Sequence, residues 1–171
     1  MRGRRELRCL QYQPVRSSFA TPARVVFRLP SGVVVTLPTE IVLAVVRRGQ
    51  RICLARRSQQ VATSRGKWSV VTGYLEPATD PLSQAWTELR EELGLCSPDL
   101  RLVRSLDAVS LSSPLSGKAF VVYSFLFECA PAANLVLNWE NDQVEWVEPS
   151  RLTSPDCVPW QQPLVEALLK H

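Results

Sequence analysis

The sequence predicts an α/β domain built on a mixed β-sheet that helices cover on both faces. Strand-like runs of β-branched residues occur before and after a central segment with helical periodicity, and a second helical segment closes the chain. Such an order of elements is typical of a sheet packed between helices. With 171 residues, 46% of them hydrophobic, the chain can bury the core of one ordinary domain.

A β-hairpin is predicted where the long apolar stretch begins. Glu40–Arg48 is a β-branched run, a Gly-Gln turn signal follows it, and Arg51–Arg57 has the composition of a second strand. Segment 58–67 is polar and lacks periodicity, which indicates a loop. We expect a short strand at Trp68–Val71 that ends at Thr72–Gly73.

An amphipathic helix is the best-defined element of the sequence. Pro81 suits its first turn, Asp80 is a good N-cap, and Gly94 is a natural C-terminal stop. Between these limits, the apolar residues are spaced as one stripe along the helix: Leu82, Ala85, Trp86, Leu89 and Leu93.

Three further strands and a closing helix are expected after Gly94. The strands are Leu100–Val109, Ala119–Cys129 and Gln143–Val147, and the helix is Pro163–Lys170. A Ser/Pro/Gly-rich loop at 110–118 separates the first two strands. Of the five tryptophans, Trp68 and Trp86 are expected in the core, whereas Trp139 lies in a loop.

The positive charge of the chain is concentrated at its N-terminus. Residues 1–28 carry seven arginines against Glu6 alone, a charge of +6, which leaves −2 on the other residues. We therefore expect a basic arm, or alternatively an organelle transit segment, at 1–28 and the folded domain at 29–171. The folded part lacks the basic excess that nucleic-acid partners require. A cytoplasmic location is favoured, with a mitochondrion or plastid as the alternative, and no run is long enough for a membrane helix.

The cysteine and histidine content excludes several classes of site. The five cysteines show no CxxC or Cys/His spacing, which favours a reduced intracellular protein without structural zinc. His171 is the only histidine and the last residue, so histidine-based triads and HExxH zinc sites are excluded.

Three glutamates on the predicted helix are the candidate catalytic groups, with a plain solvated acidic face as the alternative. Glu88, Glu91 and Glu92 are spaced by three and four residues, so their side chains share one face and repel one another. A hard divalent cation such as Mg2+ or Mn2+ prefers oxygen ligands and would offset this repulsion. It could also polarise a phosphoryl oxygen while a carboxylate orients the attacking water, which is the chemistry of phosphoanhydride hydrolysis.

The sequence around these glutamates, GYLEPATDPLSQAWTELREELGL, resembles the Nudix box. The positions that match in register are Gly73, Glu88, Leu89, Glu91, Glu92, Gly94 and Leu95. Thr79 and Thr87 stand where the family has a glutamate and an arginine that pair and brace the loop against the helix. The flanking sequences extend the resemblance to about residues 40–171, in a subgroup found beside initiation-factor-like or sugar-phosphate-isomerase-like domains.

The resemblance implies a Nudix-type α/β/α sandwich and a pyrophosphohydrolase that uses Mg2+ or Mn2+. Glu88 and Glu92 would be the principal metal ligands, Glu91 a further ligand or water orienter, and the Gly73 carbonyl an extra ligand. Glu140 is the favoured general base, with Asp142 as the other candidate; both could equally be plain loop acids. The expected substrate is a nucleoside diphosphate linked to another group, with ADP-ribose favoured by analogy with the subgroup.

Four basic residues surround the loop that leads to the box. They are Arg56, Arg57, Arg65 and Lys67, and they could grip the non-reacting phosphates or could be ordinary solvated charges. Trp139 could stack on the base of a nucleotide.

Two other functions stay open at this stage. The Thr79 and Thr87 departures motivate a catalytically weak module that senses nucleotides or docks proteins. The pI of about 9.0 prompts RNA decapping, although the basic charge lies in the leader. A homodimer is also an expectation, because Nudix dimers are common.

Overall fold

The computed structural model describes residues 26–28, 34–36, 38–112 and 119–170. The strands of its main sheet are β3 (Thr39–Arg48), β4 (Arg51–Arg57), β5 (Trp68–Ser69), β6 (Val71–Tyr74), β7 (Leu100–Ser105), β8 (Val109–Ser112), β9 (Ala119–Cys129) and β10 (Asn141–Val147). The helices are α1 (Pro81–Leu93) and α2 (Gln162–Leu169), and the short 3-10 turns η1 (Pro149–Thr153) and η2 (Pro159–Gln161) precede α2. Strands β1 (Val26–Arg28) and β2 (Val34–Thr36) pair with each other in a separate ribbon. Apart from 26–28, the predicted basic segment lies outside the described residues.

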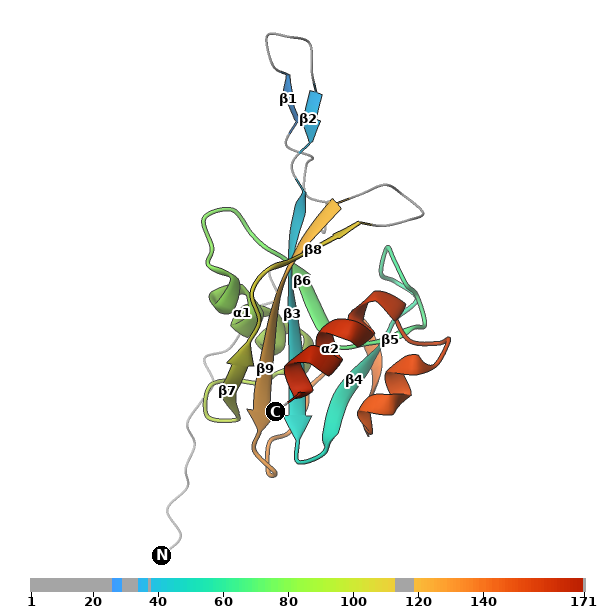
Figure 1. Cartoon of the computed structure of the whole chain (residues 1–171). Helices are drawn as coiled ribbons and strands as arrows, with labels where there is room; N and C mark the ends of the chain where they lie inside the picture. The colour runs from blue at the N-terminus through green and yellow to red at the C-terminus, as the bar shows by residue number, and fades with distance from the viewer. Residues whose placement is uncertain (1–25, 29–33, 37, 113–118, 171) are drawn as a thin grey trace, which may run out of the picture.

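The main sheet has eight strands and is mixed, as predicted. Its order is β10-β4-β3-β9-β7, with β5 beside β4, β6 beside β3 and β8 beside β9 (Figure 1). The central pair β3 and β9 is parallel, and the other pairings are antiparallel. Helices α1 and α2 lie on opposite faces of this sheet.

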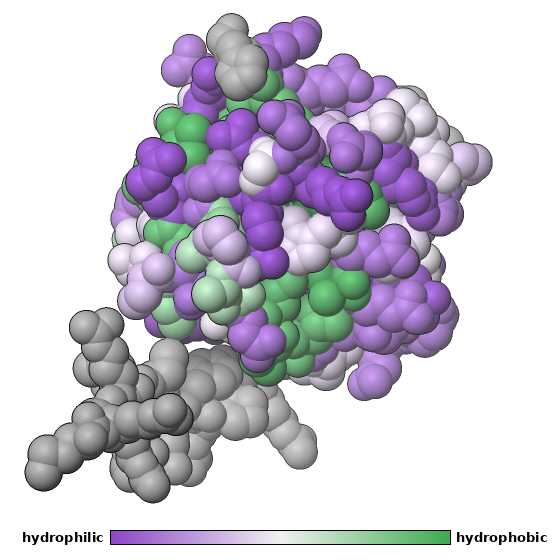
Figure 2. Space-filling view, turned by 90° about the horizontal axis from the view of Figure 1, so that it is seen from below, coloured by the Kyte–Doolittle hydropathy of each residue, from purple (hydrophilic) through white to green (hydrophobic). Residues whose placement is uncertain are grey.

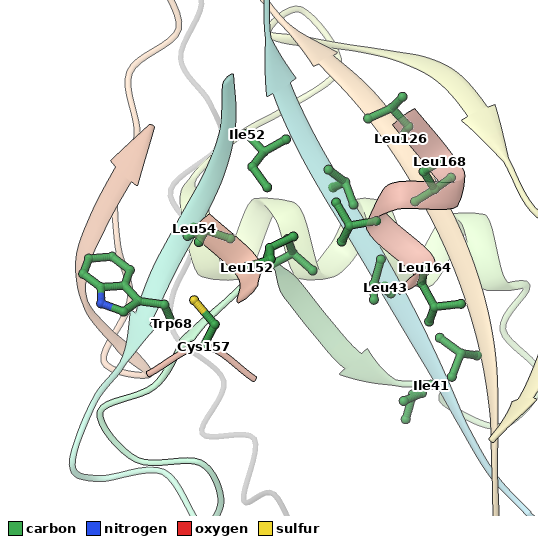
Figure 3. Close-up of a cluster of buried hydrophobic side chains, with 14 residues drawn as sticks. Ile41, Leu43, Ile52, Leu54, Trp68, Leu126, Leu152, Cys157, Leu164 and Leu168 are labelled. Carbon is green, nitrogen blue, oxygen red and sulfur yellow. The ribbon is translucent and has the colours of Figure 1, made fainter. Parts of the chain in front are cut away.

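Strand β3 is buried on both faces because its run of apolar residues is continuous. Val42, Ala44 and Val46 belong to the core beneath α1, together with Leu89 and Leu93 of that helix. The alternating residues Ile41, Leu43 and Val45 belong to the core beneath α2. Figure 3 shows this second core, where Leu164 and Leu168 of α2 face the sheet beside Leu43 and Leu126.

The tryptophans and cysteines of the described residues differ in how deeply they are buried. Trp68 is buried, as expected for a core residue, whereas Trp86 is only partly buried and packs edge-on against Phe127 with 4.8 Å between ring centroids. The described cysteines, Cys53, Cys96, Cys129 and Cys157, have free thiols. Seen from below, hydrophilic residues cover most of the surface, and an apolar patch shows in the lower part of the view (Figure 2). Within the described part of the chain, no helix has the length and hydrophobicity of a membrane span.

The prediction of one continuous strand at Trp68–Val71 is wrong. The segment is two strands, because the backbone N–H of Val70 donates to the side-chain oxygen of Gln161 (3.1 Å) instead of to a neighbouring strand. Strand β5 pairs with β4, whereas β6 crosses to β3 and continues through Gly73 to Tyr74. Gly73 is therefore inside a strand and not at its end.

The strand predicted at Leu100–Val109 is also wrong, because it is interrupted. Ser105 pairs with Phe125 and Val109 pairs with Val122. Four residue steps along the segment from β7 to β8 therefore lie opposite three residue steps along β9. The extra residue breaks the ladder into β7 and β8, as a bulge does. Strand β8 then extends into the predicted loop at 110–118, of which residues 113–118 lie outside the described part. Strand β10 starts two residues earlier than predicted, at Asn141.

The ends of α1 confirm the predicted caps and fix the neighbouring loops. Asp80 accepts a hydrogen bond from the backbone N–H of Ser83 (3.0 Å), and Gly94 ends the helix in the left-handed conformation at φ 68°. The N–H of Val136 donates to the carbonyl of Leu93 (2.9 Å). This bond docks the segment before β10 on the end of α1.

We predict that Gly94→Ala destabilises the protein more than Gly49→Ala does. Both glycines have φ near +60°, so an alanine costs about 1–2 kcal/mol at either position. Only at Gly94 would the new Cβ also meet the Cβ of Val136 at 2.9 Å, whereas nothing lies within 4 Å at Gly49. Urea unfolding of the two variants checks this, and equal losses of stability would show that the contact with Val136 is easily relieved.

Candidate active site

Two glutamates of α1 are buried against the sheet. Glu88 and Glu92 are one helical turn apart and lie on the inner face of α1 with Leu89, so only 5% and 3% of their surfaces are exposed. The sequence places them there because the apolar stripe that packs α1 on the sheet runs beside them. Burial of two carboxylates is costly unless they find partners.

Glu88 lies directly against β6. A Cβ atom on Gly73 would stand 1.9 Å from Oε1 of Glu88, so a residue without a side chain is required at this point of the strand. Oε1 of Glu88 also accepts a hydrogen bond from the side-chain nitrogen of Gln84 (2.8 Å). Gly73 and Glu88 therefore lie directly against each other in the fold.

Glu92 is held from the other side, by the first residue of β10. Its Oε2 accepts a hydrogen bond from Nδ2 of Asn141 (2.8 Å), and Asn141 is itself only 4% exposed. Among the described residues, Oε1 of Glu92 and Oδ1 of Asn141 are buried and have no hydrogen-bond partner. Two unsatisfied acceptors in one place indicate that a donor or a cation belongs there.

The electrostatic setting raises the pKa values of both carboxyls. Burial raises the pKa of Glu88 to about 7, although the hydrogen bond from Gln84 lowers it, and the charges of Glu91, Glu140 and Glu76 add to the increase. Burial, with the nearby charges of Glu88 and Glu140, raises the pKa of Glu92 to about 8. Positive charge close by would favour the ionised form of each group.

Glu140 and Asp142 have separate surroundings. Burial raises the pKa of Glu140, Arg57 lowers it, and the charge of Glu91 raises it, so Glu140 lies among the carboxylates of α1. Asp142 instead pairs with Arg56 at 2.7 Å on the surface, and the hydrogen bond from that guanidinium lowers its pKa. Of the two candidate bases, Glu140 is the one beside the helical glutamates.

The four basic residues expected around the site are not gathered in one place. Successive residues of a strand point to opposite faces, so Arg57 lies on the α1 face and Arg56 on the other. Arg57 lowers the pKa values of Glu92 and Glu140, and its Nε donates to the carbonyl of Thr63 (3.0 Å). Arg65 donates to the carbonyl of Val61 and Lys67 to that of Pro155, each at 2.7 Å.

These residues form an oxygen-rich site that suits Mg2+ or Mn2+. The donors are carboxylates, Oε1 of Glu92 has no partner, and Gly73 leaves room for Glu88 at the strand. Within the described ranges, however, no group of three or more His, Cys, Asp or Glu side chains is already gathered as a metal cluster. Glu88 and Glu92 are instead each held by a hydrogen bond from an amide side chain.

Sequence reasoning missed Gln84, Glu76 and Asn141 as neighbours of the glutamates. The four-residue spacing of Gln84 and Glu88 was a usable signal, since such pairs meet on a helix. No local signal identifies Asn141, because 49 residues separate it from Glu92. The predicted loop residue Trp139 is 49% exposed and precedes Glu140 in the chain.

Known structures share this fold. A C. elegans Ap4A hydrolase has a TM-score of 0.60 and 18% identity, covering 77% of this chain and 97% of its own. The MutT protein of Methanosarcina mazei Go1 has a TM-score of 0.61 and 21% identity, covering 77% of this chain and 93% of its own.

A curated relative and a family model match the sequence itself. An octanoyltransferase of Myxococcus xanthus is 34% identical over 98 residues, which are 57% of this chain but 26% of that protein. The chain thus spans about a quarter of the length of this relative. The NUDIX domain model matches residues 37–168, which include the main sheet, α1, all but the last residue of α2, and the glutamates of the site. On this match the chain belongs to the NUDIX domain family.

Proposed function

We propose that the protein is a divalent-metal-dependent pyrophosphohydrolase that cleaves a nucleoside diphosphate linked to another group. The observation that carries this proposal is the burial of Glu88 and Glu92 side by side, with Oε1 of Glu92 lacking a partner among the described residues. Such an arrangement is costly in the free protein and favourable once positive charge enters it.

Glu88 and Glu92 are the principal ligands in this proposal, with Glu91 and the carbonyl of Gly73 as further oxygen donors. When bound, Mg2+ or Mn2+ supplies a positive charge that polarises the phosphoryl oxygen and neutralises the charge that develops there. The two buried glutamates would hold the cation at a fixed place relative to the sheet. The fold keeps them there, because Leu89 between them is fully buried.

Glu140 acts as the general base. Water attacks phosphorus, the bridging P–O bond breaks, and the bridging oxygen leaves on the second phosphate with the bonding electrons, while the water proton passes to the Glu140 carboxylate. Burial raises the pKa of Glu140, which makes its ionised form a better base than an exposed carboxylate. Arg57 lies on the same face and can pair with a non-reacting phosphate through its guanidinium.

ADP-ribose is the favoured substrate within the proposed class. The support for it is the resemblance to a subgroup near ribose-phosphate enzymes, and a dinucleoside polyphosphate is the other candidate, since one structural neighbour is an Ap4A hydrolase. Trp139 would offer an exposed ring to a nucleotide base. The octanoyltransferase match covers too little of that protein to favour acyl transfer.

A nucleotide-binding module with weak catalysis is the second candidate function. It is favoured by the absence, in the described part of the chain, of a ready-made cluster of three metal-binding side chains, and by Thr79 and Thr87. Titration calorimetry separates the two functions, because a module would bind nucleotide tightly without turnover.

We predict metal-dependent turnover of at least one nucleoside diphosphate derivative. A panel of ADP-ribose, dinucleoside polyphosphates, NADH and nucleotide sugars is assayed with Mg2+ and with Mn2+. Glu88→Gln and Glu92→Gln should each reduce kcat by about 100-fold or more, because each removes a ligand charge. Glu166→Gln on the exposed side of α2 is the matched control and should keep wild-type kcat. No turnover by the wild type would favour the binding module.

Gly73→Ala should abolish activity, and it should also destabilise the fold because the buried Glu88 side chain has to move. The added Cβ would stand 1.9 Å from Oε1 of Glu88 and force that side chain out of the site. The φ angle of Gly73 is not positive, so alanine suits the strand backbone itself. Activity and thermal unfolding are measured together, and an active Gly73→Ala variant would mean that Glu88 need not lie against β6.

Removal of the charge at Glu92 should stabilise the metal-free protein at pH 8.5. A glutamate with an ordinary pKa of 4.5 and a folded-state pKa of about 8 stabilises the fold only while protonated, so stability falls as pH rises through this range. Glu92→Gln should therefore raise Tm by about 5 °C or more at pH 8.5. Near pH 5 the gain should largely vanish.

Saturating Mn2+ should reverse this order at pH 8.5, because only the wild-type carboxylate gains a cation. Differential scanning fluorimetry of the wild type, Glu92→Gln and the control Glu166→Gln provides the comparison. A Glu92→Gln variant that is less stable than the wild type without metal at pH 8.5 would contradict the assigned cost of burial.

A further inference from the structure

Each of the two buried glutamates of α1 accepts a hydrogen bond from a neutral amide. Nε2 of Gln84 donates to Oε1 of Glu88, and Nδ2 of Asn141 donates to Oε2 of Glu92, both at 2.8 Å. All four side chains are buried, with between 3% and 6% of their surfaces exposed. At such depth an amide cannot rotate away into solvent, so the direction of each carboxylate is fixed by its partner.

An amide partner differs from a lysine or arginine partner in its effect on the charge of the carboxylate. It donates a hydrogen bond to a carboxylate oxygen but adds no charge, so the full negative charge of the carboxylate remains for another ligand. In the Glu92 pair only Oε2 is occupied, while Oε1 of Glu92 and Oδ1 of Asn141 stay without partners in the described structure. The bond thus orients the carboxylate and keeps one of its oxygens available.

Both amides also connect α1 to a different element. Oε1 of Gln84 accepts from the backbone N–H of Glu76 (3.4 Å), which ties the loop before α1 to Glu88 through one side chain. Asn141 is the first residue of β10, so its bond to Glu92 ties α1 to the edge of the sheet. The two carboxylates are therefore fixed from two independent parts of the fold.

We infer that Gln84 and Asn141 are positioning residues that hold Glu88 and Glu92 for the binding of a divalent cation. This inference rests on the proposed function. Neither amide touches substrate or reacts; each acts through the glutamate that it contacts. Partners of this kind orient ligands, and their loss typically weakens metal binding by 10- to 100-fold.

The test measures Mn2+ binding to the full chain without substrate. Free Mn2+ is followed by electron paramagnetic resonance during titration of the metal-free protein. Gln84→Met and Asn141→Leu keep the approximate size of each side chain and remove the donor. The matched control is Gln162→Met, because Gln162 makes the same 2.8 Å bond to Glu166 four residues later on the exposed face of α2.

We expect Gln84→Met and Asn141→Leu each to weaken Mn2+ binding about 10-fold or more and to change the spectrum of the bound ion. Gln162→Met should stay within about two-fold of the wild type, with an unchanged spectrum. Wild-type affinity and spectrum in both site variants would overturn the inference, and so would an equal loss in the control. If the wild type itself binds no Mn2+, the proposed function falls as well.

A donor-retaining variant separates orientation from packing at Asn141. Asn141→Ser keeps a hydrogen-bond donor in a smaller side chain, so it should bind Mn2+ more tightly than Asn141→Leu does. The reverse order would show that Asn141 acts by filling space, which contradicts the inference. Circular dichroism of each metal-free variant confirms that the titrated protein is folded. If Asn141→Leu is not folded, the Mn2+ affinity of Asn141→Ser is compared with that of the wild type, and a wild-type spectrum with an affinity within about 10-fold supports the inference.

Discussion

The burial of two carboxylates one helical turn apart is the constraint on which the rest of the site depends. Glu88 and Glu92 cannot turn to solvent, because Leu89 and Leu93 on the same helix are completely buried against the sheet. The pKa values of both carboxyls are raised, so at neutral pH the fold works against their ionised forms. A site of this kind carries a free-energy penalty for the buried carboxylates in the free protein, and a bound cation would offset that penalty. Stability and the proposed function are thus opposed at the same two side chains, as is common where an active site is preorganised.

The sheet topology brings two strands, β6 and β10, to the buried glutamates. Strand β6 pairs with β3 and presents Gly73 to Glu88, while β10 pairs with β4 and presents Asn141 to Glu92. These two contacts approach α1 from different strands of one sheet, which is rigid because its central strand is buried on both faces. The bond from Val136 to the end of α1 fixes the chain just before Glu140. The geometry of the glutamates is therefore a property of the sheet and not of the helix alone.

The sequence predicted correctly those elements that depend on residues close together in the chain. The caps of α1 at Asp80 and Gly94, the hairpin of β3 and β4, and strand β9 all follow from residue type and periodicity. The breaks at Val70 and between Ser105 and Val109 were missed, because they depend on Gln161 and on an extra residue opposite β9. In the site, helical spacing placed Glu88 and Glu92 on one face. It could not show that Asn141 meets Glu92, since that contact depends on how distant segments pair. The separation of Arg56 from Arg57 follows from the predicted strand, because successive residues of a strand point to opposite faces.

The two threonines at 79 and 87 acquire a physical meaning from these contacts. In the resembled family pattern a charged pair braces the loop against the helix, and an arginine beside the glutamates would also neutralise part of their charge. Here Gln84 joins that loop to Glu88 with a neutral side chain, and Asn141 holds Glu92 in the same manner. The glutamate of that family pair offsets its arginine, so the pair carries no net charge, and neither do the amides here. The two threonines therefore change which side chains hold the glutamates, and the amides keep the means of orienting them.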